Sequence, residues 1–131
     1  MVAARCSADA VIATIDKLGV QAKASVASVN GPKSVVVAGT KAEVAAVLAE
    51  LGQEGKQLSV SHAFHSPLML PMAEEYRAVV TSLAESGALS SSPLHVPLVS
   101  TVTGDVAWAE ELADPEHWVR QVWSSVLFSG A

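Results

Sequence analysis

The chain has 131 residues, of which 50% are hydrophobic and 16% are charged, with a mean hydropathy of +0.38. This composition excludes an intrinsically disordered chain, which has few apolar residues and a high net charge. The net charge of −5 comes without a cluster of lysine or arginine, so no nucleic-acid partner is predicted. No apolar run approaches the ~20 residues of a membrane-spanning helix, and no signal peptide is recognisable. We therefore expect a cytoplasmic protein with a hydrophobic core and no membrane association.

The cysteine count limits the chemistry further. Cys6 is the only cysteine in the sequence, so neither a disulfide framework nor a cysteine-based zinc site can form. We interpret Cys6 as a small buried apolar residue, which is the usual role of a free cysteine.

The first part of the chain predicts alternating short strands and helices. The two helices each begin at a capping side chain, Ser7 and Thr40, and each ends at a glycine, Gly19 and Gly52. The strands are recognised by β-branched runs or by polar–apolar alternation. They are expected at residues 2–4, 24–29, 34–38 and 57–60. The resulting order is the βαββαβ order of a ferredoxin-like unit, with both helices on one face of a four-stranded sheet.

The second part of the chain, residues 61–131, has a different pattern. We expect a helix from about Leu70, a strand over residues 96–101, and a last helix that begins at Asp114 and continues to Leu127. The two helices carry more apolar side chains than one strand could cover. We therefore expect residues 61–131 to belong to a larger sheet, so that the whole chain is of the α/β (α+β) class.

A segment with two histidines, residues 60–69, joins the two parts. His62 and His65 lie three residues apart, and imidazole is the side chain best suited to proton transfer near neutral pH. A metal site would need three or four ligands, and the other histidines lie in unrelated segments, so the spacing disfavours a metal site. A general base would need a nucleophile, and no Gly-x-Ser-x-Gly elbow occurs in the sequence. From spacing alone, three interpretations of the histidine pair stay open: loop histidines without a role, a metal site and a general base.

Four motifs carry a resemblance to a known family. They closely resemble motifs that occur in the same order in the acyltransferase domain of modular polyketide synthases. The motifs are residues 27–39 (ASVNGPKSVVVAG), 60–69 (VSHAFHSPLM), 97–104 (PLVSTVTG) and 118–121 (WVRQ). The resemblance extends over essentially the whole chain. It implies an α/β-hydrolase-like large subdomain with an inserted ferredoxin-like small subdomain. Residues 1–60 resemble the small subdomain, and residues 61–131 resemble the C-terminal part of the large one.

The resemblance also implies an activity. The family loads a malonyl-type unit from coenzyme A onto an active-site serine and passes it to the phosphopantetheine arm of an acyl carrier protein, without a metal or redox cofactor. The serine, the arginine for the extender carboxylate and the oxyanion-hole donors belong to the family's N-terminal half. We therefore expect this chain to be a C-terminal portion, inactive alone. Its implied partners are malonyl-CoA, an acyl carrier protein and the remainder of a polyketide synthase chain.

Individual site residues follow from the resemblance. His65 matches the catalytic base, whose second ring nitrogen is expected to bond a main-chain carbonyl in the segment Ser100–Val102. Phe64 matches the extender-selectivity position, where a bulky ring fills the volume that an α-methyl group would need. His62, Asn30 and Thr101 are assigned to substrate binding. For Phe64 a plain packing role stays open, and Asn30 also fits a turn-forming role.

A non-enzymatic alternative is kept for the whole chain. A free-standing ferredoxin-like docking module with a helical extension would have the same first 60 residues. It would fold as a monomer without an exposed apolar patch, whereas a piece of a larger domain would expose apolar surface beyond Val60. A histidine-based metal hydrolase is a third and weaker alternative.

Overall fold

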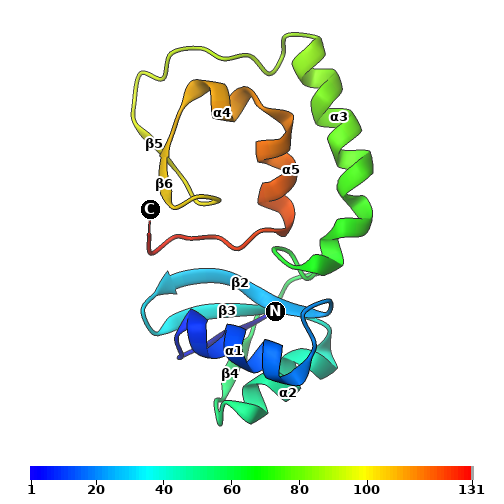
Figure 1. The fold of residues 1–131 in the computed structure, drawn as a ribbon, viewed down its shortest axis with the longest axis vertical. Coiled ribbons are helices and arrows are strands. Elements are labelled where there is room, and N and C mark those ends of the chain that lie inside the picture. The colour runs from blue at the N-terminus through cyan, green and yellow to red at the C-terminus, as the bar shows by residue number, and fades with distance from the viewer. Residues whose placement is uncertain (131) are drawn as a thin grey trace.

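The computed structural model describes residues 1–130, which form two parts stacked along the long axis of the molecule (Figure 1). The first part is a four-stranded sheet covered by two helices, and the second is a two-stranded sheet with helices at its side. No helix in the described part of the chain has the length and apolar character that crossing a membrane requires.

The first part has the predicted βαββαβ order. Its sheet order is β2-β3-β1-β4, and every neighbouring pair is antiparallel. The elements are β1 (Val2–Ala4), α1 (Ala8–Leu18), β2 (Ala24–Gly31), β3 (Ser34–Gly39), α2 (Lys41–Glu50) and β4 (Gly55–Gln57). This confirms the ferredoxin-like arrangement.

Local signals fix both helices as predicted. Ser7 Oγ accepts a hydrogen bond from the Ala10 amide at 3.3 Å, and Gly19 ends α1 in the left-handed conformation (φ 67°). Thr40 Oγ1 accepts from the Glu43 amide at 3.5 Å at the start of α2. The core between helices and sheet is rich in valine, of which Val11, Val35, Val37 and Val47 are fully buried, and Cys6 joins this core. Burial raises the pKa of the Cys6 thiol, which keeps it protonated and unreactive.

The prediction for the fourth strand was wrong by two or three residues. We expected residues 57–60, but β4 spans Gly55–Gln57 and pairs with β1 in the register Val2↔Gln57 and Ala4↔Gly55. All three residues of β4 are exposed, so apolar alternation could not mark the strand. What places it is backbone pairing to β1, at a site where Gly55 allows close approach.

The second part contains more elements than the sequence indicated. It consists of a 3₁₀ helix η1 (Pro67–Met72), α3 (Ala73–Glu85), β5 (Leu98–Ser100), β6 (Asp105–Ala107), α4 (Ala109–Ala113) and α5 (Pro115–Trp123). Neither β6 nor α4 was predicted, because β6 has a single β-branched residue, and α4 spans little more than one helical turn and has no capping side chain. The turn at residues 103–105, with Gly104 at φ 74°, joins β5 to β6.

The end of α5 also differs from the prediction. We expected a helix to Leu127, but α5 stops at Trp123, and Ser124 is extended (φ −75°, ψ 154°). The following residues run beside the edge strand β2. Val126 donates its amide to Ala27 O at 2.9 Å and accepts from the Val29 amide at 2.8 Å. Pairing with β2 therefore replaces further helical turns and ties the two parts of the molecule together.

Candidate active site

His65 lies where the two parts of the molecule meet, directly before η1. Its backbone is left-handed, with φ 56°, and it is the only residue other than glycine with a positive φ among residues 1–130. For a residue with a side chain this conformation costs roughly 1–3 kcal/mol, and it persists only where the surroundings hold it. Such backbone strain is common at functional sites.

Three hydrogen bonds hold His65 in this conformation. Its amide donates to Val122 O, at the end of α5, at 3.0 Å. Its carbonyl accepts from Ser25 Oγ, on β2, at 3.0 Å. The ring Nδ1 lies 3.0 Å from Ser124 O. Because a carbonyl oxygen only accepts, this contact requires a proton on Nδ1 and leaves Nε2 as the acceptor in the neutral ring.

The second ring nitrogen of His65 is available for chemistry. Nε2 makes no hydrogen bond with residues 1–130, and the ring is half-buried. No buried side-chain nitrogen or oxygen in that range lacks a partner, so Nε2 reaches solvent. An imidazole oriented through Nδ1, with a free basic Nε2, is the arrangement of a general base.

The carbonyl acceptor is not the one expected from the sequence. We expected a carbonyl of Ser100–Val102, but Nδ1 contacts Ser124 O. The carbonyl of Thr101 is occupied, since it accepts from the Leu127 amide at 2.7 Å. The early end of α5 explains the difference, because an extended Ser124 presents its carbonyl outward, whereas within a longer helix it would bond along the helix axis.

The two aromatic residues that precede His65 in the motif are exposed. Phe64 is 41% exposed, and its ring centroid lies 5.7 Å from that of His62, with the planes tilted by 57°. His62 Nδ1 lies 2.8 Å from Ser61 Oγ. Ser66, by contrast, is fully buried and caps η1, donating to Ala63 O at 2.5 Å and accepting from the Leu68 amide at 3.3 Å. The packed Ser66 anchors a segment whose preceding aromatic side chains face solvent.

The remaining candidates, Asn30 and Thr101, bond other parts of the chain. Asn30 is exposed near the end of β2, where its Oδ1 accepts from Ser28 Oγ at 2.6 Å. Thr101 follows β5 and holds the C-terminal segment through its carbonyl. Within residues 1–130, neither residue forms a hydrogen bond with His65. The structure thus shows a ring contact between His62 and Phe64 directly before His65, and shows no direct hydrogen bond from Asn30 or Thr101 to His65 within residues 1–130.

Two residues of the site were missed by sequence reasoning. Ser25 contacts His65 through its side-chain hydroxyl, and Ser124 contacts it through its main-chain carbonyl. A carbonyl has no residue-type signature, and one serine in a strand has no distinctive pattern. Only the meeting of β2, α5 and the His65 segment reveals them.

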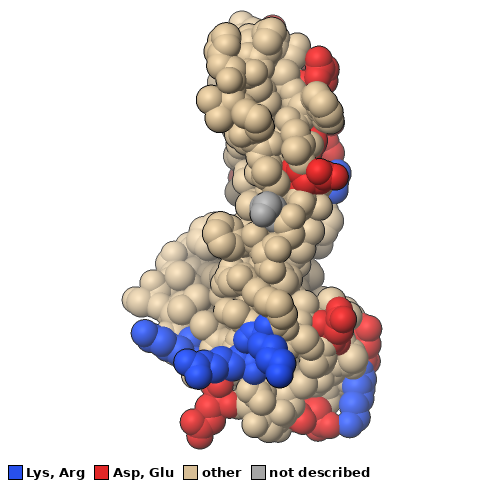
Figure 2. Space-filling model, turned by 90° about the vertical axis from the view of Figure 1, so that its left-hand side faces the viewer, with Lys and Arg blue, Asp and Glu red and all other residues tan. Residues whose placement is uncertain are grey.

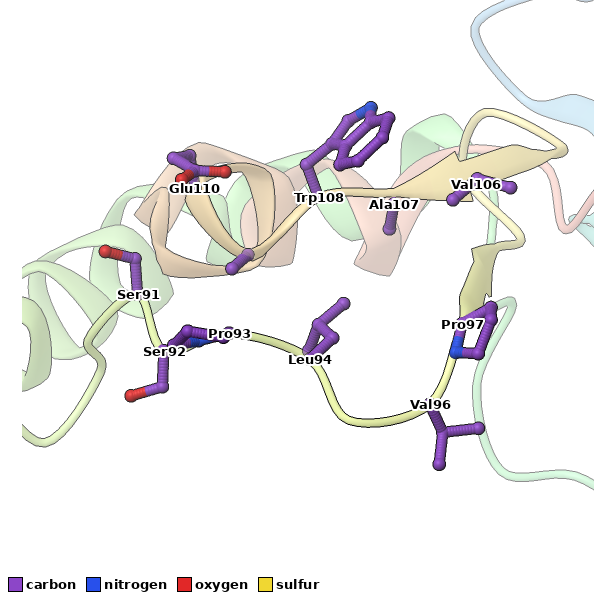
Figure 3. Close-up of a pocket in the computed structure, with 11 residues that line it drawn as sticks. Ser91, Ser92, Pro93, Leu94, Val96, Pro97, Val106, Ala107, Trp108 and Glu110 are labelled. Carbon is purple, nitrogen blue, oxygen red and sulfur yellow. The ribbon is translucent and has the colours of Figure 1, made fainter.

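A cavity lies between the segment 91–97 and the β6–α4 region (Figure 3). Its volume is about 640 Å³, and its lining is mostly apolar, with Leu94 directed into the space between the two segments. None of the candidate residues lines it. No group of three or more histidine, cysteine, aspartate or glutamate side chains within residues 1–130 is arranged to hold a metal ion.

Comparisons with known proteins place this geometry in a family. The family model described as "Acyl transferase domain" matches residues 4–131. The polyketide synthase GfsA of Streptomyces halstedii is 42% identical over 134 residues, which cover 100% of this chain and 2% of that protein. The spectinabilin polyketide synthase system protein NorB of Streptomyces orinoci is 44% identical over 107 residues, covering 79% of this chain and 5% of that protein.

Solved structures that are similar to this chain also come from polyketide synthases. The acyltransferase domain from the second module of the salinomycin polyketide synthase superimposes with a TM-score of 0.83 at 38% identity, covering 98% of this chain and 29% of that chain. A loading acyltransferase from the avermectin modular polyketide synthase gives 0.79 at 31% identity, covering 99% and 40%.

The fold is thus that of a domain that transfers acyl groups. The chain belongs to the acyl transferase domain family, in the branch found in polyketide synthases. It spans well under half the length of the solved acyltransferase chains that it matches.

Proposed function

We propose that this chain supplies the general base and the extender-selectivity residue of a malonyl-type acyltransferase, with the nucleophilic serine provided from outside these 131 residues. The observation that carries the proposal is the His65 imidazole, fixed through Nδ1 on Ser124 O and open at Nε2. Family membership supports acyl transfer as the reaction class.

In each half-reaction, the chemistry assigned to His65 is to accept one proton and to return it. In the first half-reaction, Nε2 takes the proton of the serine hydroxyl as its oxygen attacks the thioester carbonyl. Collapse of the tetrahedral intermediate breaks the carbon–sulfur bond, and the coenzyme A thiolate leaves with the proton from Nε2. In the second half-reaction, Nε2 takes the proton of the phosphopantetheine thiol, and the serine recovers it when the acyl group moves to sulfur. The Ser124 carbonyl stabilises the imidazolium formed in between.

The proposed extender unit is malonyl, and the residue that favours it is Phe64. Its exposed ring directly precedes His65 and lies beside His62, so it stands next to the proposed reacting position. A ring of this size leaves little room for an α-methyl group. The proposed partners are malonyl-CoA, an acyl carrier protein and the rest of a polyketide synthase.

The direct test is a graft. This chain replaces the matching segment of the acyltransferase domain of GfsA, which is 42% identical over the whole chain. We expect the graft to transfer malonyl from malonyl-CoA to a carrier protein, and His65→Ala to reduce the rate by at least about 100-fold. His95→Ala removes an exposed histidine in a loop and should leave the rate unchanged. Unaltered turnover in His65→Ala would remove His65 from the mechanism.

A second test uses the chain alone. Incubated with radiolabelled malonyl-CoA, the isolated chain should acquire no covalent label, because the nucleophile is supplied from elsewhere. Stable labelling would contradict this part of the proposal, and peptide mapping would identify the acylated side chain.

A further inference from the structure

The orientation of His65 depends on groups from two different parts of the fold. The end of α5 supplies Val122 O for its amide and Ser124 O for its ring. Strand β2 of the first part supplies Ser25 Oγ for its carbonyl. Of these three contacts, only the one from Ser25 is made by a side chain, so it is the one that a substitution can remove selectively.

The same strand also holds the acceptor of the imidazole in place. Ser125 Oγ donates to Val26 O at 2.5 Å, and the Val126 amide donates to Ala27 O at 2.9 Å. Ser124, whose carbonyl meets Nδ1, directly precedes these two residues. Strand β2 therefore fixes both ends of the Nδ1 contact, the residue that carries the ring and the segment that carries the carbonyl.

The left-handed backbone of His65 makes the contact from Ser25 consequential. With φ at 56°, the peptide that follows His65 is turned so that its carbonyl faces Ser25. If His65 relaxed to a negative φ, the Cα–Cβ direction would rotate and the ring would leave Ser124 O. A hydroxyl that holds the carbonyl opposes this rotation.

We propose that Ser25 is a positioning residue, whose hydroxyl holds the carbonyl of His65 and thereby keeps the imidazole in the Nδ1–H form, with Nε2 open. The consequence for acyl transfer rests on the function proposed above. The positioning itself is a property of this chain and is tested on it without substrate.

The experiment is nitrogen-15 NMR of the histidine rings in the full chain, at about pH 8.5, well above the pKa of about 6.5 of a free imidazole. In the unmodified chain, His65 should show the proton on Nδ1. In Ser25→Ala, we expect loss of that Nδ1–H signal and a shift of His65 toward the Nε2–H form. Ser25→Thr, which keeps a hydroxyl, should restore the Nδ1–H form.

Internal and matched controls separate positioning from loss of structure. His117 Nδ1 lies 3.1 Å from Glu111 Oε1 in the second part of the fold, and its signals should stay unchanged in every variant. Ser28→Ala removes another hydroxyl from the same strand, which within residues 1–130 donates to Asn30 Oδ1, and should leave His65 unaffected. If Ser25→Ala fails to fold, the pair Ser25→Thr and Ser25→Val isolates the hydroxyl, since both side chains are β-branched and of similar size.

The proposal would be overturned if His65 kept the Nδ1–H form in a folded Ser25→Ala chain. It would also be overturned if His65 had the same tautomer in the Ser25→Thr and Ser25→Val variants. These outcomes are independent of acyl transfer. An inactive graft with a normal tautomer response would refute the proposed function and leave the role of Ser25 standing.

Discussion

At the scale of single residues, Phe64 is expected to select the extender unit. A benzyl side chain next to the base excludes the volume of an α-methyl group, and serine in its place opens that volume. One methyl group is worth roughly 1–3 kcal/mol of discrimination, so in the graft Phe64→Ser should raise methylmalonyl transfer relative to malonyl transfer about tenfold or more. The measurement is competition between the two thioesters for one carrier protein.

The control for this substitution is Phe128→Ser. Phe128 is another exposed phenylalanine, at 64%, and lies outside the motif. It should leave the ratio of the two products unchanged. If Phe64 only packs, Phe64→Ser lowers both rates together, and the selectivity assignment is wrong.

A second residue-scale prediction concerns Gly55. A Cβ at this position would overlap Val2 Cγ1 and stand 3.0 Å from Ala3 O, because β4 lies tightly against β1. Gly55→Ala should therefore lower the free energy of unfolding by about 1–3 kcal/mol. Gly31→Ala is the matched control, since its nearest contact is Ser34 Cβ at an ordinary 3.7 Å. Equal denaturant midpoints for the two variants would refute the steric argument.

At the scale of elements, α5 is important because its last turn carries the partners of His65. Asp114 begins the helix, and its Oδ1 accepts from the Glu116 amide at 2.9 Å. Asp114→Ala removes this cap and should destabilise the helix by about 1 kcal/mol. We expect faster amide hydrogen exchange in the first turn of α5, with Asp114→Asn close to the unmodified chain. Unchanged exchange in the alanine variant would show that tertiary packing alone holds the helix.

Elements with local signals were predictable from the sequence, and those fixed by distant pairing were not. Both helices of the first part followed from their caps and terminal glycines, and α5 was recognised from Asp114 and Pro115. In contrast, β4 was misplaced because its position comes from pairing with β1. The end of α5 was misplaced because residues after Trp123 pair with β2, about 100 positions earlier in the chain.

The candidate site divides in the same way. His65, Phe64 and His62 were proposed from the sequence because they lie in one continuous motif that resembles a family. Three further features depend on three segments that meet in space. They are the left-handed backbone of His65 and its contacts with the Ser25 hydroxyl and the Ser124 carbonyl. No pattern within one segment of the sequence encodes such a meeting.

At the scale of the whole molecule, the two parts differ in their surfaces. Residues 1–60 carry six basic and five acidic side chains, whereas residues 61–131 carry two basic and eight acidic ones. In the view of Figure 2 the basic groups gather on the first part, and the second part is largely uncharged. Among the exposed large hydrophobic residues of the described chain, all but Ile12 and Leu18 lie at Val60 or beyond. This is the apolar exposure expected of a piece of a larger domain, and a free-standing docking module would lack it.

This apolar surface leads to a prediction for the isolated chain. Val96 and Trp108 line the 640 Å³ cavity and are 72% and 71% exposed, so the region should bind the dye ANS and promote self-association. The double variant Val96→Ser, Trp108→Ser should lower dye fluorescence by about half or more and shift the chain toward monomer in sedimentation. Ile12→Ser removes an isolated exposed apolar residue on α1 and should change neither measurement. Strong, unaltered dye binding in the double variant would show that the dye binds another surface. Absence of dye binding in the unmodified chain would favour the docking module, because a completed fold leaves no such apolar surface exposed.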